Sequence, residues 1–272
     1  MGDFPRISRG VLEALLWPFD RLPSVLGLTV FSVVSGILML LVVGQATPQK
    51  RLKVARDRMS AAVYEVRLFM DSPLRIFAAQ GRLVLWSLLY LVYLLPAFLI
   101  LLPPLALLYA PLEARYGLAP LSTDEPVLVK IHFPPPAAPS EEVTLDGIAS
   151  LDVTAPPVFV EDEGILYVRL SASTRGSHMV ELSGRGWAVE KRLTLDKTAI
   201  VVSAERRAGL GHLWALGNEP PLPLRGLVDA VTVVHPPRTE NWLGLPIPWW
   251  AYWLIVATVV ALLFRKRFGV TL

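Results

Sequence analysis

The chain has 272 residues, 53% of them hydrophobic, and it contains no cysteine. Without cysteine it cannot form disulfides, thiolate zinc sites or cysteine nucleophiles. The formal net charge of +3 is a poor guide to partners, because the charges are unevenly distributed along the chain. The apolar residues are concentrated in three blocks, a pattern typical of a membrane protein that carries a soluble part.

The first 23 residues balance three basic side chains against three acidic ones. The opening MGDFPRISRG contains Asp3, and no small-residue cleavage site follows the first apolar block, so the sequence does not predict a cleaved signal peptide. Residues 10–23, GVLEALLWPFDRLP, instead predict a short amphipathic helix at a membrane interface. An ordinary linker is the alternative interpretation.

The three apolar blocks predict three transmembrane helices, at residues 24–44, 83–110 and 247–264. The first has 21 residues and no charge, which is enough to cross a hydrocarbon core of about 30 Å. The second has 28 uncharged residues and includes Pro96 and the pair Pro103–Pro104. These prolines predict a kinked or broken helix, and a linker over residues 111–123 should then lie along the headgroups.

The third block begins with a cluster of aromatic residues, which is typical of the boundary between membrane and water. A short basic tail follows the block directly. We expect the following residues to anchor this helix: Trp249, Trp250, Trp253, Arg265, Lys266 and Arg267.

Lysine and arginine predict the orientation of the chain, because they accumulate in cytoplasmic segments. Residues 45–82 hold eight basic and three acidic side chains, whereas residues 124–240 hold eleven basic and sixteen acidic ones. We therefore expect the N-terminus outside, residues 45–82 inside, the large domain outside and residues 265–272 inside. The abundance of Arg, Ala, Leu and Pro favours a bacterial inner membrane.

Residues 45–82 are predicted to form a helical hairpin on the cytoplasmic face. Apolar side chains between Leu52 and Phe69 recur on one helical face, and Asp71 or Ser72 is a good cap for a helix that starts at Pro73. The basic side chains of the first helix mostly fall on its other faces. They are the candidate interaction residues: Lys50, Arg51, Lys53, Arg56, Arg58 and Arg67.

Three explanations compete for this positive charge. The most general is a topological signal with a solvated face. The second is attachment to anionic lipid headgroups, worth about 1 kcal/mol per basic residue near the surface. The third is docking of an anionic partner such as ribosomal RNA. Specific nucleic-acid recognition is disfavoured, since Tyr64 and Phe69 are the segment's only aromatic residues and no RNA-binding signature is present.

The layout of residues 10–110 resembles the start of the YidC/Oxa/Alb insertase superfamily. An N-out first span is followed by the basic hairpin QKRLKVARDRMSAAVYEVRLF…SPLRIFAAQGRL and by a returning second span. The small three-span archaeal and eukaryotic members are the most similar in layout. The resemblance implies a hairpin that touches nascent chains or the ribosome, and spans that form a half-open groove for short apolar segments.

The chain departs from this family pattern in two respects. Bacterial insertases carry an arginine within the first core span, whereas residues 24–44 contain no charge, and residues 111–246 separate the second span from the third. A polar groove remains conceivable from four small residues on one face of the first span. Packing between helices is the commoner role of such residues and the one we expect: Thr29, Ser32, Ser35 and Gly36.

Residues 124–238 predict an all-β domain, an immunoglobulin-like sandwich without a disulfide. Alternating apolar and polar residues predict strands at 126–133, 164–172, 177–183, 187–195, 198–204 and 227–235, with weaker strands near 148–153 and 157–160. Gly184–Arg185–Gly186 predicts a three-residue hairpin turn. The proline-rich segments 133–142 and 217–226 are expected to be connecting loops, with contact to a partner as the alternative. Residues 239–246 link the domain to the third span.

No catalytic constellation accompanies these elements. The four histidines have no carboxylate or second histidine at metal-ligand spacing. Residues 160–164, VEDEG, are compatible with a weak calcium site, although a solvated acidic turn is the better interpretation. The predicted spans contain no ionisable residue, which argues against an ion pathway. We therefore expect a protein that is not an enzyme and uses no cofactor or metal.

Two functions remain. The first is membrane-protein assembly, by an insertase-like or chaperone-like subunit. The alternative is a structural or accessory subunit of an envelope complex, which binds a partner through the β domain. In either case the expected partners are membrane lipids and proteins of the membrane or envelope, with the ribosome or a nascent chain as further candidates and no specific DNA binding.

Overall fold

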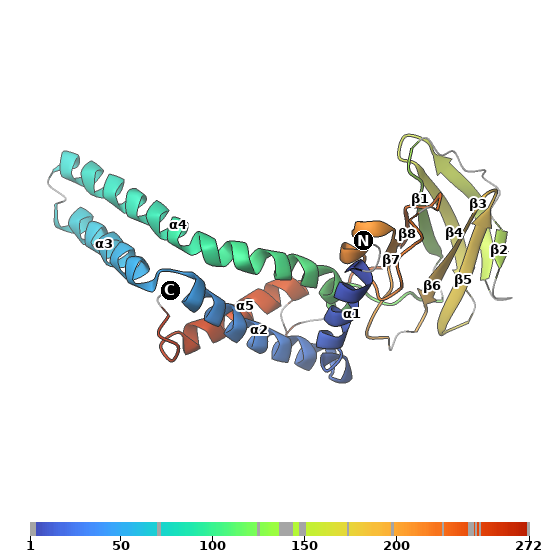
Figure 1. Cartoon of the computed structure of the whole chain (residues 1–272), viewed down its shortest axis with the longest axis horizontal. Helices are drawn as coiled ribbons and strands as arrows, with labels where there is room; N and C mark the ends of the chain where they lie inside the picture. The colour runs from blue at the N-terminus through green and yellow to red at the C-terminus, as the bar shows by residue number, and fades with distance from the viewer. Residues whose placement is uncertain are drawn as a thin grey trace. The chain divides into compact units, whose positions relative to one another are not determined.

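The computed structural model describes most of the chain in two compact units (Figure 1). Unit 1 comprises Met1–Leu28 and Leu107–Trp249, and unit 2 comprises Thr29–Ala106 and Trp250–Leu272. The residues described are 4–69, 72–123, 126–135, 144–146, 151–172, 174–196, 199–224, 226–238, 242, 244 and 246–270.

Unit 2 is helical. Its chain passes through α2 (Ser24–Ala46), α3 (Gln49–Leu68), α4 (Pro73–Leu112) and α5 (Trp249–Phe264). Within the described residues, α2 and α4 with the turn after it are long and apolar enough to cross a membrane, and α5 is a shorter apolar helix. The structure thus supports two candidate membrane spans by length and composition.

The second apolar block starts earlier than predicted, and its prolines do not break the helix. Helix α4 runs without a break through Pro96, Pro103 and Pro104, and it starts ten residues before the expected span, at Pro73. Each proline removes one backbone donor, and the long uninterrupted apolar segment around the three prolines keeps the remaining helical hydrogen bonds. The hairpin's second arm and the second apolar block therefore form one helix of 40 residues.

The segment after α4, which the sequence predicted to be an interfacial linker, is partly helical. It forms a π-helical turn, η2 (Glu113–Gly117), and Ala114, Arg115 and Tyr116 are buried in unit 1. Arg115 explains this burial, because its guanidinium donates to Asp20 Oδ1 at 2.8 Å and to Glu13 Oε2 at 2.5 Å.

These two carboxylates belong to the start of the chain. Glu13 lies in α1 (Phe4–Leu16), and Asp20 lies in the short 3₁₀ turn η1 (Phe19–Arg21). Helix α1 buries Leu16, whereas Leu15 and Trp17 are more than half exposed. The helix predicted over residues 10–23 is therefore present, with its start and end shifted towards the N-terminus.

Unit 1 also contains two antiparallel sheets, drawn in Figure 1. The larger has the strand order β3-β4-β1-β8-β7 and the smaller has the order β2-β5-β6. Their bounds are β1 Val127–His132, β2 Thr144–Asp146, β3 Leu151–Val160, β4 Ile165–Ala172, β5 Ser177–Gly184, β6 Trp187–Thr194, β7 Glu205–Arg207 and β8 Ala230–Val233. A 3₁₀ turn, η3 (Gly209–Trp214), follows β7.

Both sheets contribute side chains to one hydrophobic core. The larger sheet supplies Ile131 and Leu166, and the smaller supplies Leu182 and Leu193, all with less than 2% of their surface exposed. Trp187 also lies in this core, where its ring meets Phe133 edge-on at a centroid distance of 5.5 Å. Alternation of buried and exposed residues along β6 is what places Trp187 inside.

Most predicted strands are present within two or three residues of their expected ends, but residues 198–204 do not form one. The described part, 199–204, is irregular, and the next strand is β7. Its apolar residues are nevertheless buried, since Val202 is 0% exposed and donates its N–H to Ala114 O at 2.9 Å. The apolar residues of this segment therefore predicted its burial correctly, but the strand predicted from them is wrong.

Two further strand predictions need correction. The weak strands near 148–153 and 157–160 form a single strand, β3, which has irregular register around Ala155, while residues 147–150 lie outside the described part. The turn at Gly184–Arg185–Gly186 is shorter than predicted, because Gly184 pairs with Trp187 and leaves a two-residue loop. Gly186 has a φ of +84° there, which only glycine adopts at little cost.

Candidate functional site

The candidate site is the helical hairpin formed by α3 and the first half of α4, which we call the arm. Local bonds define where α3 begins. Thr47 Oγ1 donates to Val43 O at 2.6 Å, and Gln49 Nε2 donates to Thr47 Oγ1 at 2.7 Å. Pro48 precedes the first helical residue, and its carbonyl accepts from the N–H groups of Arg51 and Leu52. These bonds join α2 to α3 through a tight break rather than a long loop.

Helix α3 separates its apolar and basic residues by face. Leu52 and Ala55 are 0% exposed and Ala62 is 3% exposed, so this stripe is buried in unit 2. All six candidate basic side chains are exposed: Lys50, Arg51, Lys53, Arg56, Arg58 and Arg67. The predicted amphipathic pattern is therefore the one that the helix adopts.

Polar contacts set the register between α3 and α4. Arg82 forms an ion pair with Glu65, and the Arg58 guanidinium lies 5.9 Å from the Trp86 ring centroid. As the residue number falls along α3, its partner's number rises along α4, so the two helices are antiparallel. The ion pair is partly exposed, and such pairs contribute little to stability. Its value is in fixing the register.

Large apolar residues are exposed at the tip of the arm and along α4. Leu68, Leu74 and Phe77 are 76%, 84% and 71% exposed. Exposure of this size on neighbouring residues is typical of a surface that meets a membrane or a partner. The sequence pattern pointed to the basic residues of the arm and gave no reason to single out these three.

The small residues of α2 pack against α5 rather than lining an open groove. Thr29 Oγ1 and Tyr252 OH are hydrogen-bonded at 2.8 Å, and Trp253 Nε1 donates to Ser35 Oγ at 2.9 Å. A Cβ placed on Gly36 would lie only 2.7 Å from Ala257 O. The packing role expected for these residues is therefore the one observed, and we call this contact the α2–α5 seam.

The predicted anchoring residues have different surroundings. Trp249 is 4% exposed and donates its Nε1–H to Glu113 Oε2 at 2.7 Å, whereas Trp250 is 50% exposed. Of the tail, Arg265 is half-buried, and Lys266 and Arg267 are exposed.

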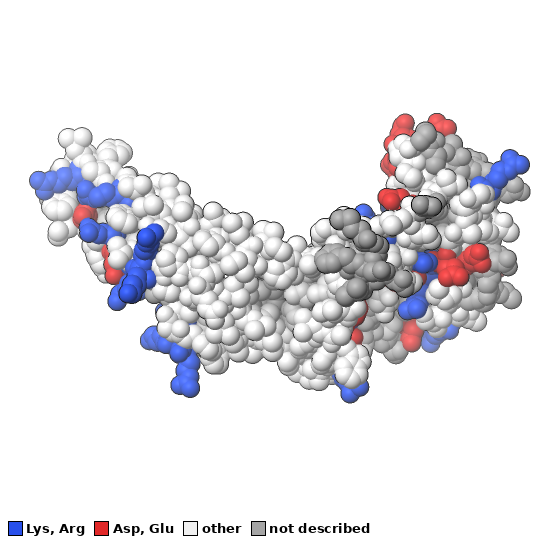
Figure 2. Space-filling model, viewed as in Figure 1, with Lys and Arg blue, Asp and Glu red and all other residues white. Residues whose placement is uncertain are grey.

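The tail returns to the end of α2. Val270 is 8% exposed, and its Cγ2 would lie 2.9 Å from a Cβ on Gly44. Along the seam, contacts at higher residue numbers of α2 involve higher residue numbers of α5. The two helices therefore run parallel and end at the same side of unit 2. Figure 2 shows Lys and Arg gathered at this end, over the arm and the tail, with uncharged surface along the helices. Arm and tail thus form one basic end.

A different polar cluster is buried in the β domain. Lys191 is 0% exposed and forms an ion pair with Glu219, while Ser203 Oγ donates to Glu219 Oε2 at 2.6 Å. The other carboxylate oxygen accepts from the N–H of Arg192 at 2.6 Å. Burial lowers the pKa of Lys191 and the adjacent carboxylate opposes that shift.

This cluster fixes the segment around Glu219 against the edge of β6 that faces away from its paired strand, β5. Sequence reasoning missed it. The signal was present, since Lys191 stands at an inward position of an alternating strand, between Val189 and Leu193.

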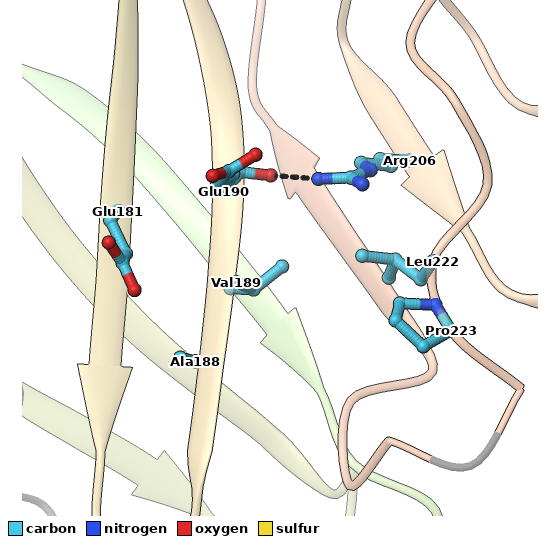
Figure 3. A pocket seen from close by; sticks show the side chains of 7 residues that line it. All are labelled: Glu181, Ala188, Val189, Glu190, Arg206, Leu222 and Pro223. Carbon is cyan, nitrogen blue, oxygen red and sulfur yellow. Dashed lines mark hydrogen bonds between the residues drawn. The ribbon is translucent and has the colours of Figure 1, made fainter.

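The surface of the β domain also carries a small cavity of about 270 Å³ between β5, β6 and residues 222–223 (Figure 3). Glu181 and Glu190 are directly paired across the two strands and line it. Arg206 lies on the opposite side, where it donates to Glu190 O at 2.5 Å and to Pro220 O at 2.8 Å. Two like charges in one cross-strand pair are destabilising by themselves.

Among the described residues, no group of three or more His, Cys, Asp or Glu is placed to hold a metal ion. Glu161, Asp162 and Glu163, the acidic turn for which a calcium site was considered, are exposed, and Glu163 accepts a hydrogen bond from Tyr167 OH at 2.8 Å.

Comparison with known proteins returned no matching family model, no matching curated protein and no matching solved structure. The arm, the α2–α5 seam and the cavity lined by Glu181, Glu190 and Arg206 are the features of the described structure that bear on function.

Proposed function

We propose that the chain is a non-enzymatic integral membrane protein that assists the assembly of other membrane proteins. In this proposal α2, α4 and α5 span the membrane, the arm and the tail are cytoplasmic, and the β domain, an immunoglobulin-like sandwich, lies on the other side. A bacterial inner membrane is the proposed location.

One observation carries the proposal: the arm buries its apolar stripe and keeps its basic side chains exposed. Leu52, Ala55 and Ala62 are buried, whereas the six basic side chains are exposed. A basic surface of this kind suits anionic lipid headgroups, and beyond the part that meets lipid it also suits an anionic partner such as the ribosome that delivers a nascent chain. The layout resemblance to the YidC/Oxa/Alb superfamily supports the same function.

The α2–α5 seam limits how assembly would be assisted. Thr29 and Ser35 bond to aromatic side chains of α5, so these hydroxyls are unavailable to line a polar groove. We therefore place client contact on the arm rather than within the seam.

A second candidate function is favoured by the carboxylates that line one side of the cavity in the β domain. A cross-strand pair of carboxylates, Glu181 and Glu190, is a cost that a basic partner segment would relieve. In this function the chain is an accessory subunit of an envelope complex, and the β domain carries the binding surface.

Site-specific photo-crosslinking separates the two functions. A photoreactive residue replaces Val63, which is 46% exposed on the arm, or the exposed Ala188 beside the cavity, and Leu263, 72% exposed on α5, serves as the control position. Membrane-protein assembly predicts adducts with ribosomes or nascent chains from Val63 and none from Leu263 in translating cells. Adducts to one envelope protein from Ala188 alone would support the accessory role and contradict the first function.

A further inference from the structure

The register of the arm places an apolar stripe of α4 beside the basic half of α3. Arg58 lies opposite Trp86, and Gln49, the first residue of α3, precedes Arg58 by nine residues. Nine residues along antiparallel α4 from Trp86 end at Leu95, about 13.5 Å further on. Residues 86–95 of α4 therefore flank the first half of α3, not α2.

This segment of α4 is strongly apolar and poorly covered. Leu88, Leu91, Val92 and Leu95 follow the spacing of one helical face and are 56%, 61%, 57% and 49% exposed. We call these four residues the ledge. At the same level α3 exposes its basic residues: Lys50, Arg51, Lys53 and Arg56.

An upright arm would make this arrangement unfavourable. If the membrane ended where α2 ends, the ledge would stand in water. If the membrane covered the ledge with hydrocarbon on all sides, the basic side chains of α3 would be desolvated. Only an interface resolves both problems, because there acyl chains meet the ledge while long basic side chains reach the headgroups.

We propose that the arm lies obliquely in the headgroup layer of an anionic leaflet, with acyl chains on the ledge and lipid phosphates on the basic residues of α3. The inference rests on the proposed membrane-spanning role of α4. Two observations favour lipid as the occupant. The basic residues complement anionic headgroups, and the ledge continues into Phe98 and Leu99, both 60% exposed, in the part of α4 that a span would present to lipid.

An oblique α4 also explains its length. An apolar helix longer than the hydrocarbon core is thick accommodates by tilting, and tilting lowers α3 towards the interface. The basic residues of α3 then limit the tilt of α4, because they remain at the headgroups.

The absence of cysteine allows a clean test with single-cysteine variants of the full chain, labelled with the environment-sensitive fluorophore NBD. Leu88→Cys and Leu91→Cys report on the ledge, Phe98→Cys on the proposed span, and Ser60→Cys on an exposed polar position of α3. The proteins are reconstituted in vesicles of phosphatidylcholine with phosphatidylglycerol and quenched either by aqueous iodide or by a nitroxide near the lipid headgroup.

The proposal predicts that nitroxide quenches Leu88 and Leu91 at least threefold more strongly than iodide does, and that Ser60 shows the reverse preference. Replacement of Lys50, Arg51, Lys53 and Arg56 by glutamine should raise iodide quenching at Leu88 about twofold and leave Phe98 unchanged. Phe98 also verifies that each variant has inserted.

Two results would overturn the proposal. Iodide quenching at Leu88 as strong as at Ser60 would show that the arm stands in water. Protection of Leu88 from both quenchers would show that protein, such as a second copy of the chain, covers the ledge. The vesicles contain neither ribosomes nor clients, so failure here leaves the crosslinking test of the proposed function intact, and the converse also holds.

Discussion

His235 follows β8 in the β domain and is 9% exposed. One ring nitrogen lies 2.9 Å from Val233 O, and Nε2 has no hydrogen-bond partner among the residues that the structure describes. Burial lowers the pKa of His235 from 6.5 to about 4, and the nearby Lys191 ammonium adds to this effect. The folded domain therefore holds this ring in its neutral form.

This lowered pKa predicts that acid destabilises the β domain. Between pH 6.5 and about 4 the unfolded chain takes up a proton that the folded chain excludes, so stability falls as the pH falls. The loss approaches about 3 kcal/mol below pH 4. Unfolding of the full-length protein in detergent, followed by tryptophan fluorescence at pH 7 and pH 5, measures it.

The His235→Phe variant should lose part of this pH dependence, because phenylalanine cannot take up the proton. His178→Gln is the matched control on β5, and it should keep the dependence of the original chain. If the free energy of unfolding fell by the same amount between pH 7 and pH 5 in the His235 variant and in the original chain, the acid sensitivity would belong to other groups.

Lys191 and Glu219 form a buried ion pair in the β domain. Removal of one partner leaves a buried charge without compensation, which typically costs about 3–5 kcal/mol. We expect Lys191→Met to destabilise the full chain by that amount, and the double variant Lys191→Met with Glu219→Leu to recover at least half of it. A double variant as unstable as the sum of both single variants would show that the two side chains do not act as a pair.

At this scale the sequence predicted exposed residues better than buried polar ones. The basic residues of α3 were recognised because an amphipathic period assigns them to an exposed face. The partners of Lys191 and Arg115 were not, since Glu219 and Glu13 are 28 and 102 residues away along the chain. No local pattern records such a pairing.

At the scale of elements, hydrophobic pattern predicted helices and strands wherever one face is buried and the other is free. β1, β4, β5 and β6 alternate in this way and were found close to their expected ends. Residues 199–204 were predicted to form a strand because burial without sheet pairing depends on tertiary surroundings that a local pattern does not contain. The prolines of α4 do not break the helix, because the long apolar segment around them keeps the remaining helical hydrogen bonds.

The α2–α5 seam gives a prediction at this scale. A methyl group on Gly36 would lie 2.7 Å from Ala257 O, whereas a methyl group on Gly81 of α4 has no atom within 4 Å. Gly36→Ala should therefore separate the two helices and lower the thermal midpoint in detergent. Gly81→Ala should leave it unchanged or raise it, because alanine favours a helix by about 1 kcal/mol over glycine. Similar midpoints for the two variants would argue against close packing at Gly36.

At the scale of the whole molecule, the account depends on the side of the membrane that each part faces. Unit 2 gathers the arm and the tail at one basic end, and the β domain carries a net acidic sequence of eleven basic against sixteen acidic side chains over residues 124–240. Under the positive-inside rule these parts face opposite sides. Both proposed functions and the lipid-bound arm require this orientation.

Labelling of single cysteines with a membrane-impermeant maleimide tests it directly, since the chain has no cysteine of its own. Asp162→Cys lies in an exposed turn of the β domain, and Ser60→Cys lies on the exposed polar side of α3. In intact spheroplasts that make the full chain, the account predicts labelling at residue 162 and labelling at residue 60 only after the membrane is permeabilised. Labelling at residue 60 in intact spheroplasts, with residue 162 protected, would contradict it.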